Sequence, residues 1–134
     1  MMYSTETDIR KILQKIEFMA DRELDKYHNV FPDYDYYGRE YGGVSALYDI
    51  RVELAECSRR PMMINTEDIN NYNQRLTELN MFKGFARKLK RNCCNVPDTL
   101  NDTKRRRDLL KRIMDFADYV IIELDRIDLP KNNV

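Results

Sequence analysis

The stretch LKRIMDFADYVIIELDRI, residues 110–127, carries the clearest structural signal in this chain of 134 residues. Apolar residues recur in it at spacings of three and four, which is the repeat of one face of an α-helix. Charged residues occupy many of the positions between them, so only one side of the segment is suited to burial. We therefore expect a helix over residues 103–128, with a buried stripe of Leu110, Ile113, Ala117, Val120, Leu124 and Ile127.

Three other segments repeat apolar residues at the same spacing, over residues 7–27, 44–59 and 67–93. No segment alternates apolar and polar residues as a half-buried strand does. The length suits one domain with a core of its own. Short connections favour antiparallel neighbours. We expect an all-α fold, an antiparallel bundle of about four helices built from two helical hairpins, as a single helical domain over residues 1–134.

Residues that begin or end helices flank these segments. Thr5 or Thr7 can cap the first helix, and Asn65 or Thr66 can cap the third, because their side-chain oxygens accept from free backbone N–H groups. Pro61 is expected to stop the second helix.

The third helix has the widest apolar face. Its width predicts contacts with two neighbouring helices, and it also allows a homodimer. The expected face comprises Ile69, Tyr72, Leu76, Leu79, Phe82, Ala86 and Leu89, widened by Met81 and Phe85.

Charge is unevenly distributed although the net charge is zero. Residues 1–58 carry a net charge of −5, residues 59–112 of +8 and residues 113–134 of −3. In an antiparallel hairpin the end of the third helix and the start of the fourth would lie side by side. We expect one basic tip that either binds a polyanion or is neutralised by acids elsewhere in the fold. Its residues are Lys83, Arg87, Lys88, Lys90, Arg91, Lys104, Arg105, Arg106, Arg107, Lys111 and Arg112.

A second unusual stretch is DYDYYGREYGG, residues 33–43, between the first two helices. Tyrosine buries much area at low entropic cost and keeps a polar end, so it is frequent at interfaces. The segment is therefore predicted to recognise a protein partner. The alternative is a lid, in which Phe31 and two of the tyrosines fold over the open end of the bundle. The candidate partner-binding residues are Tyr34, Asp35, Tyr36, Tyr37 and Tyr41.

Cysteine and histidine content argues against a metal site. Cys57, Cys93 and Cys94 form no CxxC pair, and His28 is the only histidine. We expect free thiols, and neither a metal nor a cofactor. The N-terminus lacks a signal pattern, and no apolar run is long enough to cross a membrane. The sequence predicts a soluble, cytoplasmic protein with no membrane partner.

Catalytic signals are weak, and an enzyme is not the preferred prediction. Arg22 and His28, with five residues between them, resemble the arginine–histidine spacing of the HEPN ribonuclease family. That resemblance implies RNA cleavage, with His28 handling protons and Arg22 holding phosphate.

The stretch YYGREYGGVSALYDIRVELAEC, residues 36–57, resembles a segment of small phage-encoded helical accessory proteins. There an aromatic, glycine-rich loop leads into a short amphipathic helix. The resemblance implies an accessory protein that binds and redirects a host factor, such as a defence or transcription component.

The preferred prediction is a non-enzymatic interaction protein, of the kind that inhibits or modulates a host or partner complex. It would dock through the acidic tyrosine segment and the basic tip. The first alternative is a nucleic-acid-binding regulator that uses the basic tip, and the second is a HEPN-like ribonuclease.

Overall fold

The computed structural model describes residues 2–32, 45–64, 66 and 71–129. These residues form an all-α bundle, as the sequence predicts. Its elements are α1 (Glu6–Val30), α2 (Ser45–Arg59), the short 3-10 helix η2 (Arg60–Met63), α3 (Tyr72–Cys94) and α4 (Lys104–Asp125).

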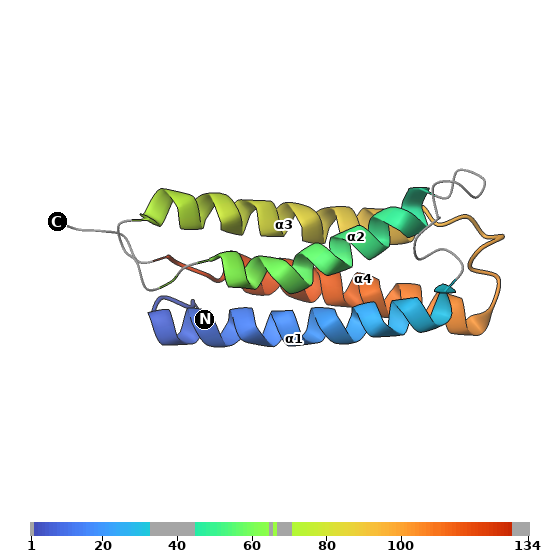
Figure 1. Ribbon diagram of the computed structural model, residues 1–134, viewed down its shortest axis with the longest axis horizontal. Helices are drawn as coiled ribbons and strands as arrows, with labels where there is room; N and C mark the ends of the chain where they lie inside the picture. Colours follow the sequence, from blue (N-terminus) through green and yellow to red (C-terminus); the bar gives the residue numbers. More distant parts are fainter. Residues whose placement is uncertain (1, 33–44, 65, 67–70, 130–134) are drawn as a thin grey trace.

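The four α-helices run alternately up and down along the long axis of the molecule (Figure 1). The most extensive contacts join α3 to α4, α1 to α2, and α2 to α3, and α1 also touches α4. The predicted contact of the third helix with two neighbours is therefore confirmed. The end of α1 and the starts of α2 and α4 lie at the same end of the bundle (Figure 1).

Threonine caps set two of the helix starts. The side-chain oxygen of Thr5 accepts a hydrogen bond from the backbone N–H of Asp8 at 3.2 Å, and that of Thr103 accepts from Arg106 at 3.2 Å. Each bond satisfies one backbone N–H of the first helical turn, which has no hydrogen-bond acceptor within the helix. The third helix departs from the prediction, because α3 begins at Tyr72, with Asn71 as its cap residue.

Most of the apolar stripes predicted from periodicity are buried. All six predicted positions of the fourth helix lie in the core, although Ile127 follows the end of α4, and so do Leu47, Ile50, Leu54 and Cys57 of α2. One continuous core joins all four helices.

The start of α3 contradicts the predicted face. Leu76 is 37% exposed, whereas Arg75 is only 1% exposed and is the largest fully buried side chain. The buried positions Leu79, Phe82 and Ala86 continue towards the N-terminus by a step of four, which reaches Arg75 rather than Leu76. Arg75 lies with its guanidinium 6.0 Å from the centre of the Tyr72 ring. Spacing alone could not choose between steps of three and four.

A short N-terminal segment fastens the opposite end of the bundle. The backbone N–H of Tyr3 donates to the carbonyl of Arg126 at 2.7 Å, and Asp128 donates to the carbonyl of Tyr3 at 2.9 Å. The Tyr3 hydroxyl donates to Glu123. Among the described helices, none is both long enough and apolar enough to span a bilayer.

Candidate functional site

The basic residues of α3 and α4 do not form one tip. Lys83 pairs with Asp125 at 3.2 Å, and Lys90 pairs with Asp118 at 2.7 Å. A step of seven residues towards the C-terminus of α3 therefore corresponds to a step of seven residues towards the N-terminus of α4. This register places the end of α3 level with the middle of α4. Lys83 lies about 30 Å along the bundle from Lys104, at 1.5 Å per helical residue. The expectation of side-by-side basic ends is therefore wrong.

Acidic residues of the fold neutralise part of this set. Five of the eleven predicted cations have a carboxylate oxygen of a described residue within 4.0 Å. The best-shielded acid among them is Glu23 on α1, which accepts from Arg112 Nε at 2.7 and 2.9 Å. The pairs are Lys83–Asp125, Lys90–Asp118, Lys104–Asp108, Arg106–Asp102 and Arg112–Glu23.

The remaining six cations, three on α3 and three on α4, have no carboxylate partner among the described residues. Lys88 lies 5.6 Å from the centre of the Phe85 ring, and Arg107 donates to the carbonyl of Asp102 at 2.9 Å. The others make no ion pair with any residue that the structure describes, and all are exposed: Arg87 and Arg91 on α3, and Arg105 and Lys111 on α4.

A groove of about 300 Å³ lies between the end of α1 and the start of α4. Lys26 and Arg105 line it, and neither has a carboxylate partner among the described residues. The hydrogen bond from Lys104 lowers the pKa of Asp108, another residue that lines the groove. Arg106 turns away, lies 5.0 Å from the Phe31 ring and donates to the carbonyl of Leu100. The groove residues are Lys26, Asn29, Val30, Arg105, Asp108, Leu109 and Arg112.

A second groove, of about 390 Å³, lies between α2 and α3. Glu53 is buried beside it and accepts from the Asn92 side-chain amide at 2.9 and 2.8 Å. Burial raises the pKa of Glu53 to about 7, because a neutral amide only partly compensates a buried charge. Apolar periodicity and charge distribution did not single out this pair. The groove residues are Asp49, Val52, Glu53, Phe85, Lys88, Arg91 and Asn92.

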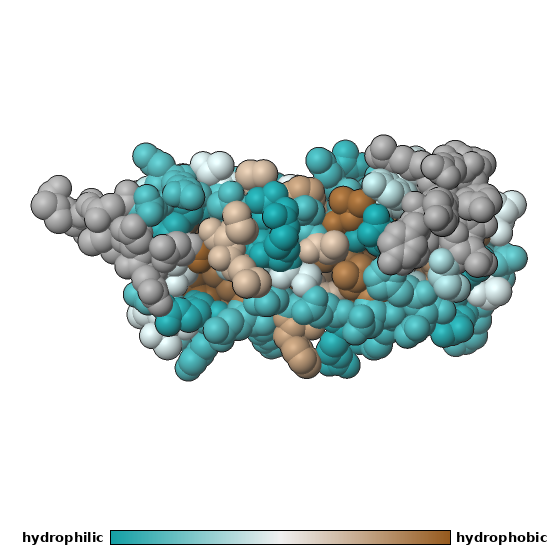
Figure 2. All heavy atoms as spheres, viewed as in Figure 1, coloured by the Kyte–Doolittle hydropathy of each residue, from teal (hydrophilic) through white to brown (hydrophobic). Residues whose placement is uncertain are grey.

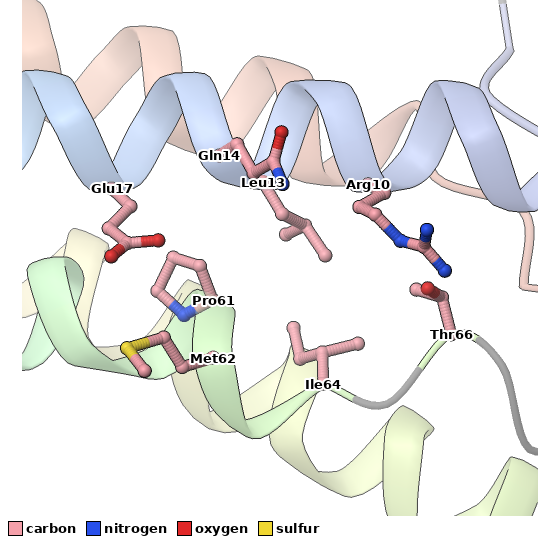
Figure 3. Close-up of a pocket in the computed structure, with 8 residues that line it drawn as sticks. All are labelled: Arg10, Leu13, Gln14, Glu17, Pro61, Met62, Ile64 and Thr66. Atoms are coloured by element: carbon pink, nitrogen blue, oxygen red, sulfur yellow. The ribbon is translucent and has the colours of Figure 1, made fainter.

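A third groove, of about 420 Å³, lies between α1 and η2. Figure 3 shows Glu17 and Arg10 at its two ends, with Leu13 between them. Met62 on the facing wall is 75% exposed, and Phe18 on α1 is 63% exposed. Apolar surface is visible on this side of the molecule (Figure 2). The lining residues are Arg10, Leu13, Gln14, Glu17, Pro61, Met62, Ile64 and Thr66.

The predicted tyrosine surface lies outside the described residues. Tyr34, Asp35, Tyr36, Tyr37 and Tyr41 all belong to residues 33–44, which the structure does not describe. Phe31, which precedes them, is fully buried, with its ring centre 5.3 Å from that of Tyr27. Phe31 is buried, as the lid alternative expects, but the tyrosines of that alternative lie outside the described residues.

Arg22 and His28 do not converge on one site. Six residues of an α-helix turn through about 600°, which leaves these side chains about 120° apart around α1. Arg22 lies over the Phe18 ring at 5.9 Å, and His28 lies against the edge of Tyr27 with ring centres 6.2 Å apart.

The cysteines are free thiols, as predicted. Cys57 and Cys93 are buried and Cys94 is exposed. Burial raises the pKa of Cys57 and of Cys93, which keeps both thiols protonated. Within the described part of the chain, no three His, Cys, Asp or Glu residues gather as metal ligands would.

Comparison of the chain with protein-family models, curated proteins and solved structures finds no match.

Proposed function

We propose that this protein is a non-enzymatic interaction protein that docks on a protein partner through the groove between α1 and η2. The observation that carries the proposal is the exposure of Met62 at 75% beside a hollow with a buried apolar floor. Leu13, Pro61 and Ile64 form that floor (Figure 3). A partner side chain that entered the hollow would cover Met62 and remove its exposed apolar surface from water.

The energetics favour such a contact. Burying a methionine or phenylalanine side chain contributes about 1.5–3 kcal/mol. Met62 and Met63 are unbranched and adapt to the shape of a partner. Glu17 at one end of the groove would favour a positive charge on the incoming segment, whereas Arg10 at the other end is paired with Glu6.

Site-specific crosslinking tests this proposal. A photoreactive residue at position 62 is expected to capture a partner, and one at Ile122, which is exposed on α4, is not. The purified partner is then titrated calorimetrically against Met62→Glu and the matched control Ile122→Glu. We expect at least tenfold weaker binding for Met62→Glu and unchanged binding for the control. Equal binding by the two variants would refute the groove as the docking site.

The tyrosine segment is a predicted further part of this docking function. The resemblance of residues 36–57 to phage accessory proteins directs the search for the partner towards a host complex. The double substitution Tyr36→Ala with Tyr37→Ala should weaken binding without changing the Tm. Unchanged affinity would remove the segment from the proposal.

Polyanion binding at the start of α4 is the second candidate function. It is favoured by Lys26 and Arg105, which line the α1–α4 groove and have no carboxylate partner among the described residues. Binding to duplex DNA or RNA should then weaken steeply with salt, because phosphate contacts release counterions. Arg105→Glu with Lys111→Glu should abolish it, and Arg106 is left unchanged because it packs on Phe31. Salt-independent binding, or binding by the double variant, would rule this function out.

A further inference from the structure

Gly84 lies in the interior of α3, where no contact within the described part of the molecule requires a glycine. Glycine destabilises a helix interior relative to alanine, because it loses more backbone freedom on folding. A Cβ atom placed on Gly84 would have no neighbour within 4 Å among the described atoms. Packing inside the molecule therefore does not require glycine here. A bare backbone does allow another chain to approach closely.

The surface around Gly84 is hollowed and partly apolar. Met81, Gly84, Phe85 and Lys88 line a depression of about 190 Å³. Residues three and four apart share one face of a helix, so these four form a continuous strip. The depression shares Phe85 and Lys88 with the groove between α2 and α3. Met81 is 42% exposed, which leaves an apolar wall open to a partner.

The rim of this strip is positively charged. Arg87, Lys88 and Arg91 are exposed, and none forms an ion pair with a described carboxylate. Lys83 and Lys90, on the side of α3 that faces α4, are paired with Asp125 and Asp118. Unpaired positive charge is thus concentrated on the outer face and the α2 side of α3.

We infer that this face of α3 binds an acidic amphipathic helix of a protein partner. One apolar side chain of the partner enters the depression beside Gly84, and its carboxylates meet Arg87, Lys88 and Arg91. A nucleic acid would use the cations but not the apolar depression. The surface is distinct from the α1–η2 groove, so the inference goes beyond the proposed function and does not depend on it.

A designed peptide provides the probe. It has about 18 residues, five helical turns, with leucine along one face and glutamate, glutamine and alanine elsewhere. One control peptide has the same composition in scrambled order, and another has lysine in place of glutamate. Binding to the full chain is followed by two-dimensional NMR of backbone amides. The chain has four glycines, so the Gly84 signal falls in a sparsely populated region of the spectrum.

The designed peptide should shift the amide signals of Met81, Gly84, Phe85 and Lys88, and the two control peptides should not. Gly84→Ala should raise the Tm by about 3–5 °C and weaken the peptide severalfold. Gly84→Leu should weaken it at least tenfold and remain folded. Arg87→Glu with Arg91→Glu should weaken it at least tenfold, and the control Lys11→Glu on α1 should not.

Opposite changes in stability and binding distinguish a docking site from a merely tolerated glycine. Full affinity in Gly84→Ala and Gly84→Leu would overturn the inference. So would equal binding of the scrambled peptide, shifts confined to the start of α4, or no shift at about 1 mM peptide. If duplex DNA displaced the peptide and shifted the same amide signals, this face would be a phosphate-binding surface. That result would also overturn the inference.

Discussion

Two seams of the bundle each bury one glutamate to the same extent and treat its charge differently. Glu23, between α1 and α4, and Glu53, between α2 and α3, are both 5% exposed. Glu23 meets the guanidinium of Arg112, whereas Glu53 meets the neutral amide of Asn92. Only the first partner carries a compensating charge. Although the two glutamates are equally buried, the stability of the α1–α4 seam therefore depends on an ion pair, and that of the α2–α3 seam depends on protonation of Glu53.

The difference appears in the chemistry of Glu53. Burial is the main cause that raises its pKa to about 7, and the charge of Asp49 adds to the increase. The Asn92 hydrogen bonds and the charges of Lys88 and Arg91 act in the opposite direction. Near neutral pH this seam exists in two protonation states. Its stability should respond to pH over a range where most carboxylates are fully ionised.

The largest expected effect comes from removing the charged partner of Glu23. Arg112→Ala leaves a buried carboxylate without compensation and should lower the free energy of unfolding by about 3 kcal/mol at pH 7. This is the low end for a broken buried pair, because the Arg112 side chain is 49% exposed. Urea denaturation measures it without added salt. The control Arg105→Ala, on the same helix, should change stability little, and an equal loss in both variants would contradict the argument.

The second prediction concerns the proton on Glu53. Its folded pKa, about 7, lies above the ordinary value of 4.5. The folded state therefore binds the proton more tightly, and this contribution to stability is complete below pH 4.5 and is lost as pH rises through 7. Glu53→Gln keeps the hydrogen-bond acceptor and removes the titration. It should match the wild type near pH 4.5 and exceed its stability by about 3 kcal/mol at pH 8.

A urea series between pH 4.5 and 8 measures this difference. The control Glu17→Gln, on α1, makes the same chemical change away from the α2–α3 seam. A difference between Glu53→Gln and wild type that stays constant with pH would show that Glu53 does not take up a proton in this range.

Periodicity predicted the parts of the molecule that depend on neighbours along the chain. The predicted stripe of the fourth helix and the apolar residues of α2 are buried as expected, because spacings of three and four place residues on one face. The same rule failed where a step of three and a step of four from Leu79 were both possible. At the start of α3 the buried position fell on Arg75, and Leu76 stayed at the surface.

The candidate surfaces could not be predicted in this way, because they depend on how far the helices slide past one another. Periodicity says nothing about that offset, which separates the basic stretch of α3 from that of α4. A signal was present, since Lys83 and Lys90 are seven residues apart and so are Asp118 and Asp125. Glu53 lies three residues after Ile50 and four before Cys57, so spacing places it on the buried face of α2. No repeated spacing, however, links it to its partner Asn92, 39 residues away along the chain.

The smallest expected effect comes from removing the neutral partner of Glu53. Asn92→Ala deletes the hydrogen bonds that lower the Glu53 pKa, so that pKa should rise above 7. The free energy of unfolding should fall by about 1 kcal/mol at pH 8, the usual value for a lost hydrogen bond. At pH 5 the loss should be smaller, because Glu53 is then protonated and leaves no charge unsatisfied. Urea denaturation at the two pH values measures this. If the loss were larger at pH 5, Asn92 would stabilise the protonated acid, and the contrast between the two seams would not rest on charge.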